Sequence, residues 1–122
     1  MKIENFNYEP DANSISLCID GKLISIVCEN LKSAYLYENA NTILALSREG
    51  NSYSSLIGFL VEGERKFEVG PPDGFSFYYL TNHPKAEASV ICVSEKYVDG
   101  WTDWYFSVDI SNGNLTRLCP AY

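Results

Sequence analysis

The residue types that carry nucleophilic catalysis are scarce in this chain. His83 is the only histidine and therefore the only imidazole that could activate a nucleophile. Cys92 or a serine could meet it in space, but a histidine followed by Pro84 is more typical of an exposed loop. The Gly-x-Ser-x-Gly pattern of many serine hydrolases is absent. We therefore expect no nucleophilic active site.

Carboxylates are the next candidates for chemistry. Glu62, Glu64 and Glu68 surround one expected turn, and Asp99 and Asp103 surround another. A hydrolase of the glycosidase type needs two carboxylates at a set separation in a cleft, whereas turn positions favour solvated side chains. We expect neither a catalytic pair nor an enzyme.

Metal and cofactor sites are not expected either. The sequence contains no Cys-x-x-Cys pair, no His-x-x-x-His spacing, no calcium-binding loop and no phosphate-binding glycine loop. The four cysteines are expected to be free thiols because no export signal precedes them; they are Cys18, Cys28, Cys92 and Cys119.

The segment with the strongest binding character runs from residue 95 to residue 106. It contains both tryptophans, two tyrosines and several carboxylates around a glycine turn, a combination that suits a contact surface for a basic protein. Alternation from residue 102 onward places Trp104 in the core and Trp101 on the opposite face, where Trp101 could either contact a partner or cover the end of the sheet. The predicted partner-binding residues are Glu95, Tyr97, Asp99, Trp101 and Asp103.

Composition limits the classes of partner. Sixteen acidic and nine basic residues give a formal charge of −7, which disfavours nucleic acids and anionic membranes. A basic protein fits this charge, although acidity can also serve solubility alone. The chain has no apolar run long enough for a membrane helix and begins without a signal-peptide pattern, so we expect a cytoplasmic protein.

The elements that must position these residues are short strands. Alternating runs flank Asp20-Gly21, which predicts a two-residue hairpin turn that pairs Leu17 with Ile24 and Ile15 with Ile26. In this register Cys18 and Cys28 project from opposite faces and cannot form a disulfide.

Similar runs and turn residues continue to the end of the chain. Residues 31–38 could form either a strand or a short helix, and residues 81–87 are expected to be a polar connection with one helical turn at most. We predict a single β domain, residues 1–122, with an antiparallel meander of about nine short strands, little helix and a sandwich or barrel architecture.

The C-terminal residues 103–118 resemble the ending of small bacterial immunity proteins. The similarity lies in an Asp103-Trp104-Tyr105-Phe106 strand, an Asn112-Gly113 turn and a final Leu115-Thr116-Arg117-Leu118 strand. These proteins accompany polymorphic toxins, including those of contact-dependent growth inhibition. The resemblance implies a non-catalytic cytosolic protein that binds one toxin domain, in many cases a basic nuclease, and blocks its active site.

Two further hypotheses remain open at this stage. One is a small-ligand or lipid-binding β domain with a cavity lined by Phe59, Phe77, Tyr79 and Trp104, and the other is a carboxylate-dependent hydrolase. Oligomeric state and strand order do not follow from the sequence.

Overall fold

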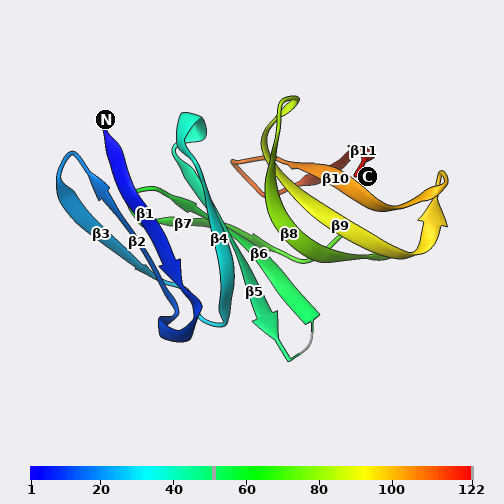
Figure 1. Ribbon diagram of the computed structural model, residues 1–122, viewed down its shortest axis with the longest axis horizontal. Helices are drawn as coiled ribbons and strands as arrows, with labels where there is room; N and C mark the ends of the chain where they lie inside the picture. Colours follow the sequence, from blue (N-terminus) through cyan, green and yellow to red (C-terminus); the bar gives the residue numbers. More distant parts are fainter. Residues whose placement is uncertain (51, 122) are drawn as a thin grey trace.

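The chain folds into antiparallel strands arranged in three sheets (Figure 1). The computed structural model describes residues 1–50 and 52–121. Strands make up 69% of the chain and helical turns 5%, and the described residues form a sandwich rather than a closed barrel. The eleven strands are β1 (Ile3–Glu9), β2 (Ser14–Ile19), β3 (Lys22–Val27), β4 (Leu31–Tyr37), β5 (Thr42–Glu49), β6 (Ser52–Leu60), β7 (Arg65–Val69), β8 (Phe75–His83), β9 (Ala86–Val98), β10 (Trp101–Val108) and β11 (Leu115–Pro120). Two 3-10 turns, η1 (Pro10–Ala12) and η2 (Glu38–Ala40), complete the elements. The mainly β prediction is confirmed, and the described residues contain eleven strands instead of about nine.

The β2–β3 hairpin has the predicted register. Leu17 pairs with Ile24 and Ile15 pairs with Ile26. Asp20 and Gly21 have φ angles of 49° and 81°, which is the left-handed conformation that this turn requires at both central positions. Cys18 and Cys28 are free thiols, as expected from their opposite faces, and Cys92 and Cys119 are free as well.

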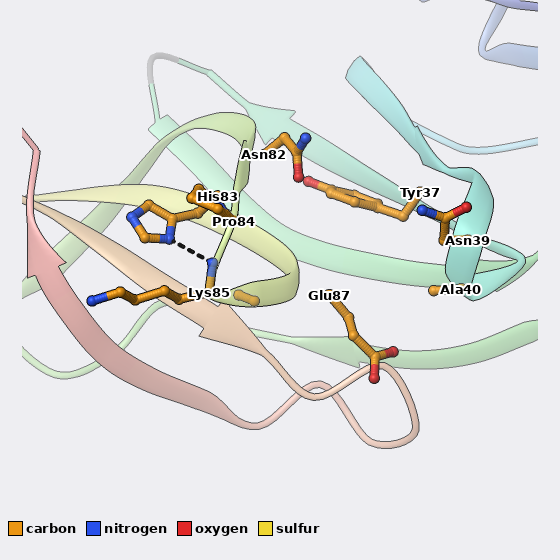
Figure 2. Close-up of a pocket in the computed structure, with 9 residues that line it drawn as sticks. Tyr37, Asn39, Ala40, Asn82, His83, Pro84, Lys85 and Glu87 are labelled. Atoms are coloured by element: carbon orange, nitrogen blue, oxygen red, sulfur yellow. Dashed lines mark hydrogen bonds between the residues drawn. The ribbon is translucent and has the colours of Figure 1, made fainter.

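Two segments show where local patterns were ambiguous or misleading. Residues 31–37 form a strand that pairs with β5, with a register shift between Leu31 and Ser33, and both faces of this strand contribute to the cores. The prediction of a polar connection over residues 81–87 was wrong: β8 continues to His83, β9 begins at Ala86, and the chain turns at Pro84 and Lys85 (Figure 2). These residues are polar because the end of this hairpin is largely open to solvent, so they lack the apolar alternation of a covered strand.

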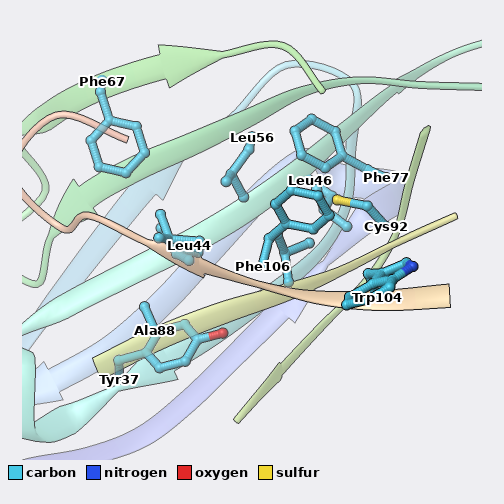
Figure 3. Close-up of a cluster of buried hydrophobic side chains, with 12 residues drawn as sticks. Tyr37, Leu44, Leu46, Leu56, Phe67, Phe77, Ala88, Cys92, Trp104 and Phe106 are labelled. Atoms are coloured by element: carbon cyan, nitrogen blue, oxygen red, sulfur yellow. The ribbon is translucent and has the colours of Figure 1, made fainter. Parts of the chain in front are cut away.

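The sheet of β4, β5, β6 and β7 is the middle layer of the sandwich (Figure 1). Ile43 and Ala45 of β5 belong to an apolar core shared with the sheet of β1, β2 and β3. Leu44 and Leu46, which point the other way, belong to a core shared with the sheet of β8, β9, β10 and β11 (Figure 3). The unbroken apolar run of β5 is therefore explained by burial on both faces.

Tyr37 connects the middle layer to the C-terminal sheet. Its side chain is buried, and its hydroxyl points at two backbone carbonyl oxygens, of Thr81 at 2.5 Å and of Ser89 at 2.9 Å. Burial raises the pKa of Tyr37 above its ordinary value and keeps the phenol neutral. A buried hydroxyl with these acceptors fixes how the two sheets lie on each other.

The ring of Phe67 is held between two glycines. A Cβ atom added at Gly58 or at Gly113 would collide with ring carbons of Phe67, so each glycine leaves the space that the ring occupies. Gly113 also has a φ of 82°, as its place in the turn before β11 requires. Phe67 thereby packs the middle of β7 against the β10–β11 connection.

We expect the substitution Gly58→Ala to lower the free energy of unfolding by about 1–3 kcal/mol, because the new methyl group displaces the Phe67 ring. Chemical denaturation measures the change. Gly70→Ala is the matched control, since nothing lies within 4 Å of a Cβ at that position. Equal stability of the two variants would contradict the proposed packing of Phe67 on Gly58.

Alkaline pH should destabilise the fold through its buried thiols. Burial raises the pKa of Cys92 from 9.0 to about 12, and burial also raises the pKa of Cys28. The folded state therefore keeps protons that the unfolded state loses above pH 9.0. The stabilising contribution of Cys92 is complete below pH 9.0 and falls as the pH approaches 12, with a slope of at most about 1.4 kcal/mol per pH unit.

Cys92→Ala should make this decline shallower, as measured by urea denaturation at a series of pH values. Val90→Ala, a truncation of a neighbouring buried residue without a titratable group, should leave the slope unchanged. Identical slopes in the two variants would exclude Cys92 as a source of the pH dependence.

Candidate functional site

The acidic and aromatic segment forms the tip of the β9–β10 hairpin. The two strands turn at Asp99 and Gly100, whose φ angles of 48° and 89° match a two-residue hairpin turn. The hairpin extends away from the middle layer and reaches one end of the molecule (Figure 1). We call the surface formed by Glu95, Tyr97, Asp99, Trp101 and Asp103 the hairpin tip.

The two strands lose regular pairing inside the hairpin tip. Trp101 pairs with Val98, and the next pair is Asp103 with Val93. Residues 94–97 of β9 lie between these pairs, whereas Thr102 alone lies between them on β10. Such a bulge bends the strand outward and changes the direction of its side chains. It carries two of the predicted contact residues, Glu95 and Tyr97.

The predicted contact residues are brought together, and most of them are accessible. Tyr97 is 78% exposed and Trp101 is 42% exposed, which makes them two of the large apolar side chains that face solvent. Glu95 and Asp99 are exposed, and Asp103 is half-buried. As predicted, Trp104 is buried in the core while Trp101 lies at the surface.

Arg117 of β11 contacts two residues of the β9–β10 hairpin. Its guanidinium group lies 4.5 Å from the centre of the Trp104 ring and donates a hydrogen bond to Asp99 at 2.9 Å. The Trp104 indole N–H in turn donates to the backbone carbonyl of Trp101 at 3.2 Å. These contacts join the Asp-Trp strand to the Leu-x-Arg-Leu strand and orient the turn at Asp99. Sequence reasoning assigned no contact to Arg117, although the motif itself contained it.

A further acidic residue, Asp73, lies close to the hairpin tip. An open hollow of about 580 Å³ is lined by the loop before β8 and by the bulged part of β9. Asp73 lines it from one side, and Glu95 and Tyr97 line it from the other. The sequence could not indicate this neighbour, because the two segments meet only through the pairing of β8 with β9.

His83 does not meet Cys92, which lies fully buried in the core. It lies instead at the rim of an open hollow beside η2, with its ring against Tyr105 and its Nε2 atom 3.5 Å from the Cys119 sulfur (Figure 2 shows the hollow). The backbone N–H of Lys85 donates to its Nδ1 atom at 3.1 Å. In the neutral ring, Nε2 must then carry the hydrogen, and it cannot accept the proton of the Cys119 thiol. This geometry does not activate Cys119 as a nucleophile.

The carboxylates considered for a catalytic pair are exposed, except for the half-buried Asp103, and within the described residues three of the five have a polar partner elsewhere. Glu68 binds Arg65 at 3.0 Å and accepts a hydrogen bond from Ser55, while Glu62 and Glu64 are exposed. Asp99 binds Arg117, and Asp103 accepts a hydrogen bond from Thr102 at 3.0 Å.

The four residues expected to line a ligand cavity do not share one space. Phe59 belongs to the core next to the N-terminal sheet, whereas Phe77 and Trp104 belong to the core next to the C-terminal sheet. Tyr79 is 47% exposed. The prediction of a common cavity was therefore wrong, because the middle sheet separates the two cores.

Comparison of the chain with known protein families, with curated proteins and with solved structures finds no match. Within the described residues, no group of three or more His, Cys, Asp or Glu side chains is arranged to hold a metal ion. In the same part of the chain, no helix has the length and apolar character needed to span a membrane.

The thiols should separate into two classes in alkylation experiments. Cys28 and Cys92 are buried and have raised pKa values, while Cys18 and Cys119 are partly exposed. Iodoacetamide should modify Cys18 and Cys119 in the native protein and reach the other two only after unfolding, because the thiolate is the reacting form. Peptide mass spectrometry over time measures this order. Uniform modification of all four cysteines without denaturant would contradict the described burial.

Proposed function

We propose that this chain is a cytoplasmic immunity protein that binds a cognate toxin domain through the hairpin tip and blocks its active site. The toxin domain is expected to be basic, and a nuclease fits this expectation. The observation that carries the proposal is the exposure of Tyr97 and Trp101 on a bulged hairpin surrounded by carboxylates. The resemblance of residues 103–118 to immunity proteins and the net charge of −7 support the same conclusion.

The two kinds of side chain in the hairpin tip have different roles in this proposal. Tyr97 and Trp101 supply large rigid surfaces whose burial against a partner contributes most of the affinity. Glu95, Asp99 and the neighbouring Asp73 supply negative charge that accelerates the encounter with a basic surface and takes the place of nucleic-acid phosphates. An inhibitor built in this way occludes a nuclease site without any chemistry of its own.

The Arg117 contact prepares Asp99 for this role. A carboxylate held by a guanidinium group at 2.9 Å has fewer conformations to lose when a partner arrives. The same ion pair reduces the charge that Asp99 presents to a partner. Glu95 and Asp73 have no ion pair among the described residues, so they contribute more to electrostatic attraction than Asp99.

The direct test is to identify the protein encoded immediately upstream of this chain's gene and to co-express the C-terminal domain of that protein with the chain. The proposal predicts that the chain restores growth of cells that produce this domain, and that the two purified proteins form an equimolar complex. Calorimetry measures the stoichiometry. Failure both to bind and to protect would overturn the proposal.

Charge reversal in the hairpin tip should act mainly on the association rate. Glu95→Lys combined with Asp73→Lys should slow association with the toxin domain and flatten its dependence on salt, because steering by opposite charges is lost. Glu62→Lys combined with Glu64→Lys, in an exposed turn elsewhere, makes the same change in net charge and serves as the control. Stopped-flow kinetics at several salt concentrations separates the two variants, and equal rates would remove the hairpin tip from the binding surface.

Truncation of Trp101 should raise the dissociation rate of the complex rather than lower its association rate. We expect Trp101→Ala to weaken the complex by about 2 kcal/mol, or roughly 30-fold, as is typical of a buried interface tryptophan. Tyr78→Ala removes another exposed aromatic side chain outside the hairpin tip and should leave the affinity unchanged. A loss of affinity in Tyr78→Ala alone would place the interface on β8.

A further inference from the structure

We propose that two copies of this chain associate through strand β3, antiparallel and edge to edge, with Ser25 of one copy opposite Ser25 of the other. β3 is an outer strand of the N-terminal sheet, whose order is β1-β2-β3. It bonds to β2 on one side, and no strand of the described residues pairs with its other side. This inference does not depend on the proposed function.

The open side of β3 presents a regular row of backbone groups. In a hairpin with a two-residue turn, the residues that flank the turn bond to each other, and every second residue does the same. Lys22, Ile24 and Ile26 therefore direct their N–H and C=O groups toward β2, whereas Leu23, Ser25 and Val27 direct theirs outward. Within the described residues, no hydrogen bond outside the sheet uses these three outward residues.

The pairing of β2 with β3 also lacks the irregularity seen elsewhere. Every other strand pairing between described residues contains a register shift, and only β2 with β3 runs without one. Register shifts, charges and prolines protect sheet edges from pairing with another chain. Arg65, Lys66 and Glu68 provide charge on β7, and Pro120 ends β11. β3 has Lys22 as its one charged residue, at its first position.

Two of the three side chains on the solvent face of β3, those of Leu23 and Val27, are apolar and can pack on each other across a two-fold axis. Leu23 is 68% exposed and Val27 is 77% exposed, on the same face of the strand as Ser25. In the Ser25-centred antiparallel register, Leu23 of each copy lies opposite Val27 of the other. All the outward N–H and C=O groups then find partners, and both exposed side chains gain an apolar cross-strand neighbour.

Charge favours the antiparallel direction. Lys22 begins β3, and Glu29 follows its end after Cys28. Both side chains are exposed. A two-fold arrangement brings the basic end of one strand to the acidic end of the other at both ends of the pair, whereas a parallel arrangement would place like charges together. A second copy therefore suits this edge in geometry, apolar contact and charge.

The two surfaces lie at opposite ends of the molecule. β3 forms one end of the sandwich and the β9–β10 hairpin reaches the other (Figure 1). A dimer through β3 leaves both hairpin tips accessible. Because one strand per copy is a small contact, we expect a weak dimer, in the micromolar range.

Sedimentation velocity over a concentration series tests the proposal. The unmodified chain should shift from monomer to dimer, and Ser25→Pro should remain monomeric. Proline removes an outward N–H that the monomer does not use, so the fold should tolerate it. Circular dichroism and thermal unfolding verify that it does. Tyr78→Lys, which adds a charge at an exposed aromatic residue on another strand, should dimerise like the unmodified chain.

A pair of double variants tests the register itself. Leu23→Lys with Val27→Lys places like charges opposite each other and should abolish the dimer. Leu23→Lys with Val27→Glu places opposite charges there and should restore it, although it removes the same apolar surface. Concentration-independent monomers of the unmodified chain would overturn the proposal, and so would equal behaviour of the two double variants. Loss of toxin binding in Ser25→Pro, with the unmodified chain monomeric, would assign the edge to a different partner.

Discussion

The structure depends on one constraint, the complete burial of β5 on both faces. Ile43, Leu44, Ala45 and Leu46 are all 0% exposed, although successive side chains of a strand point in opposite directions. Its apolar side chains therefore need cover on both faces of the sheet. The N-terminal three-stranded sheet covers one side and the C-terminal four-stranded sheet covers the other. The division of a short chain into three layers follows from this requirement.

The same constraint determines which parts of the covering sheets are free to bind partners. β9 has 13 residues, and Ala88, Val90 and Cys92 of its buried stretch belong to the core shared with the middle layer. The part beyond Val93 leaves that support, loses regular pairing with β10 and carries the exposed Tyr97. On the N-terminal sheet, Ile24 and Ile26 of β3 face the core, while Leu23 and Val27 face away from it. The hairpin tip and the open edge of β3 therefore belong to the outer sheets but take no part in covering the middle sheet.

Features that depend on a few neighbouring residues could be predicted from the sequence. The Asp20-Gly21 turn, the burial of Trp104 and the exposure of Trp101 all follow from local turn chemistry and from alternation along one strand. Features that depend on distant segments could not. The contact of His83 with Cys119, the position of Asp73 beside Glu95 and the packing of Phe67 on Gly58 each join residues from different strands or loops. The end of the β8–β9 hairpin was misread because strands outside the core lose the apolar pattern that identifies them.

The net charge of −7 has a different meaning once the fold is known. An acidic chain with two apolar cores must place its carboxylates at the surface, so acidity alone selects no face. The hairpin tip combines carboxylates with the exposed rings of Tyr97 and Trp101, and exposed apolar surface of this kind is typical of a contact site. Arg117 contributes to this surface as well. Its guanidinium group binds Asp99 and packs on the Trp104 ring, and so it holds the turn at Asp99 in place. The arrangement of charge around Tyr97 and Trp101, rather than its total, is therefore the feature on which the proposed recognition of a basic protein rests.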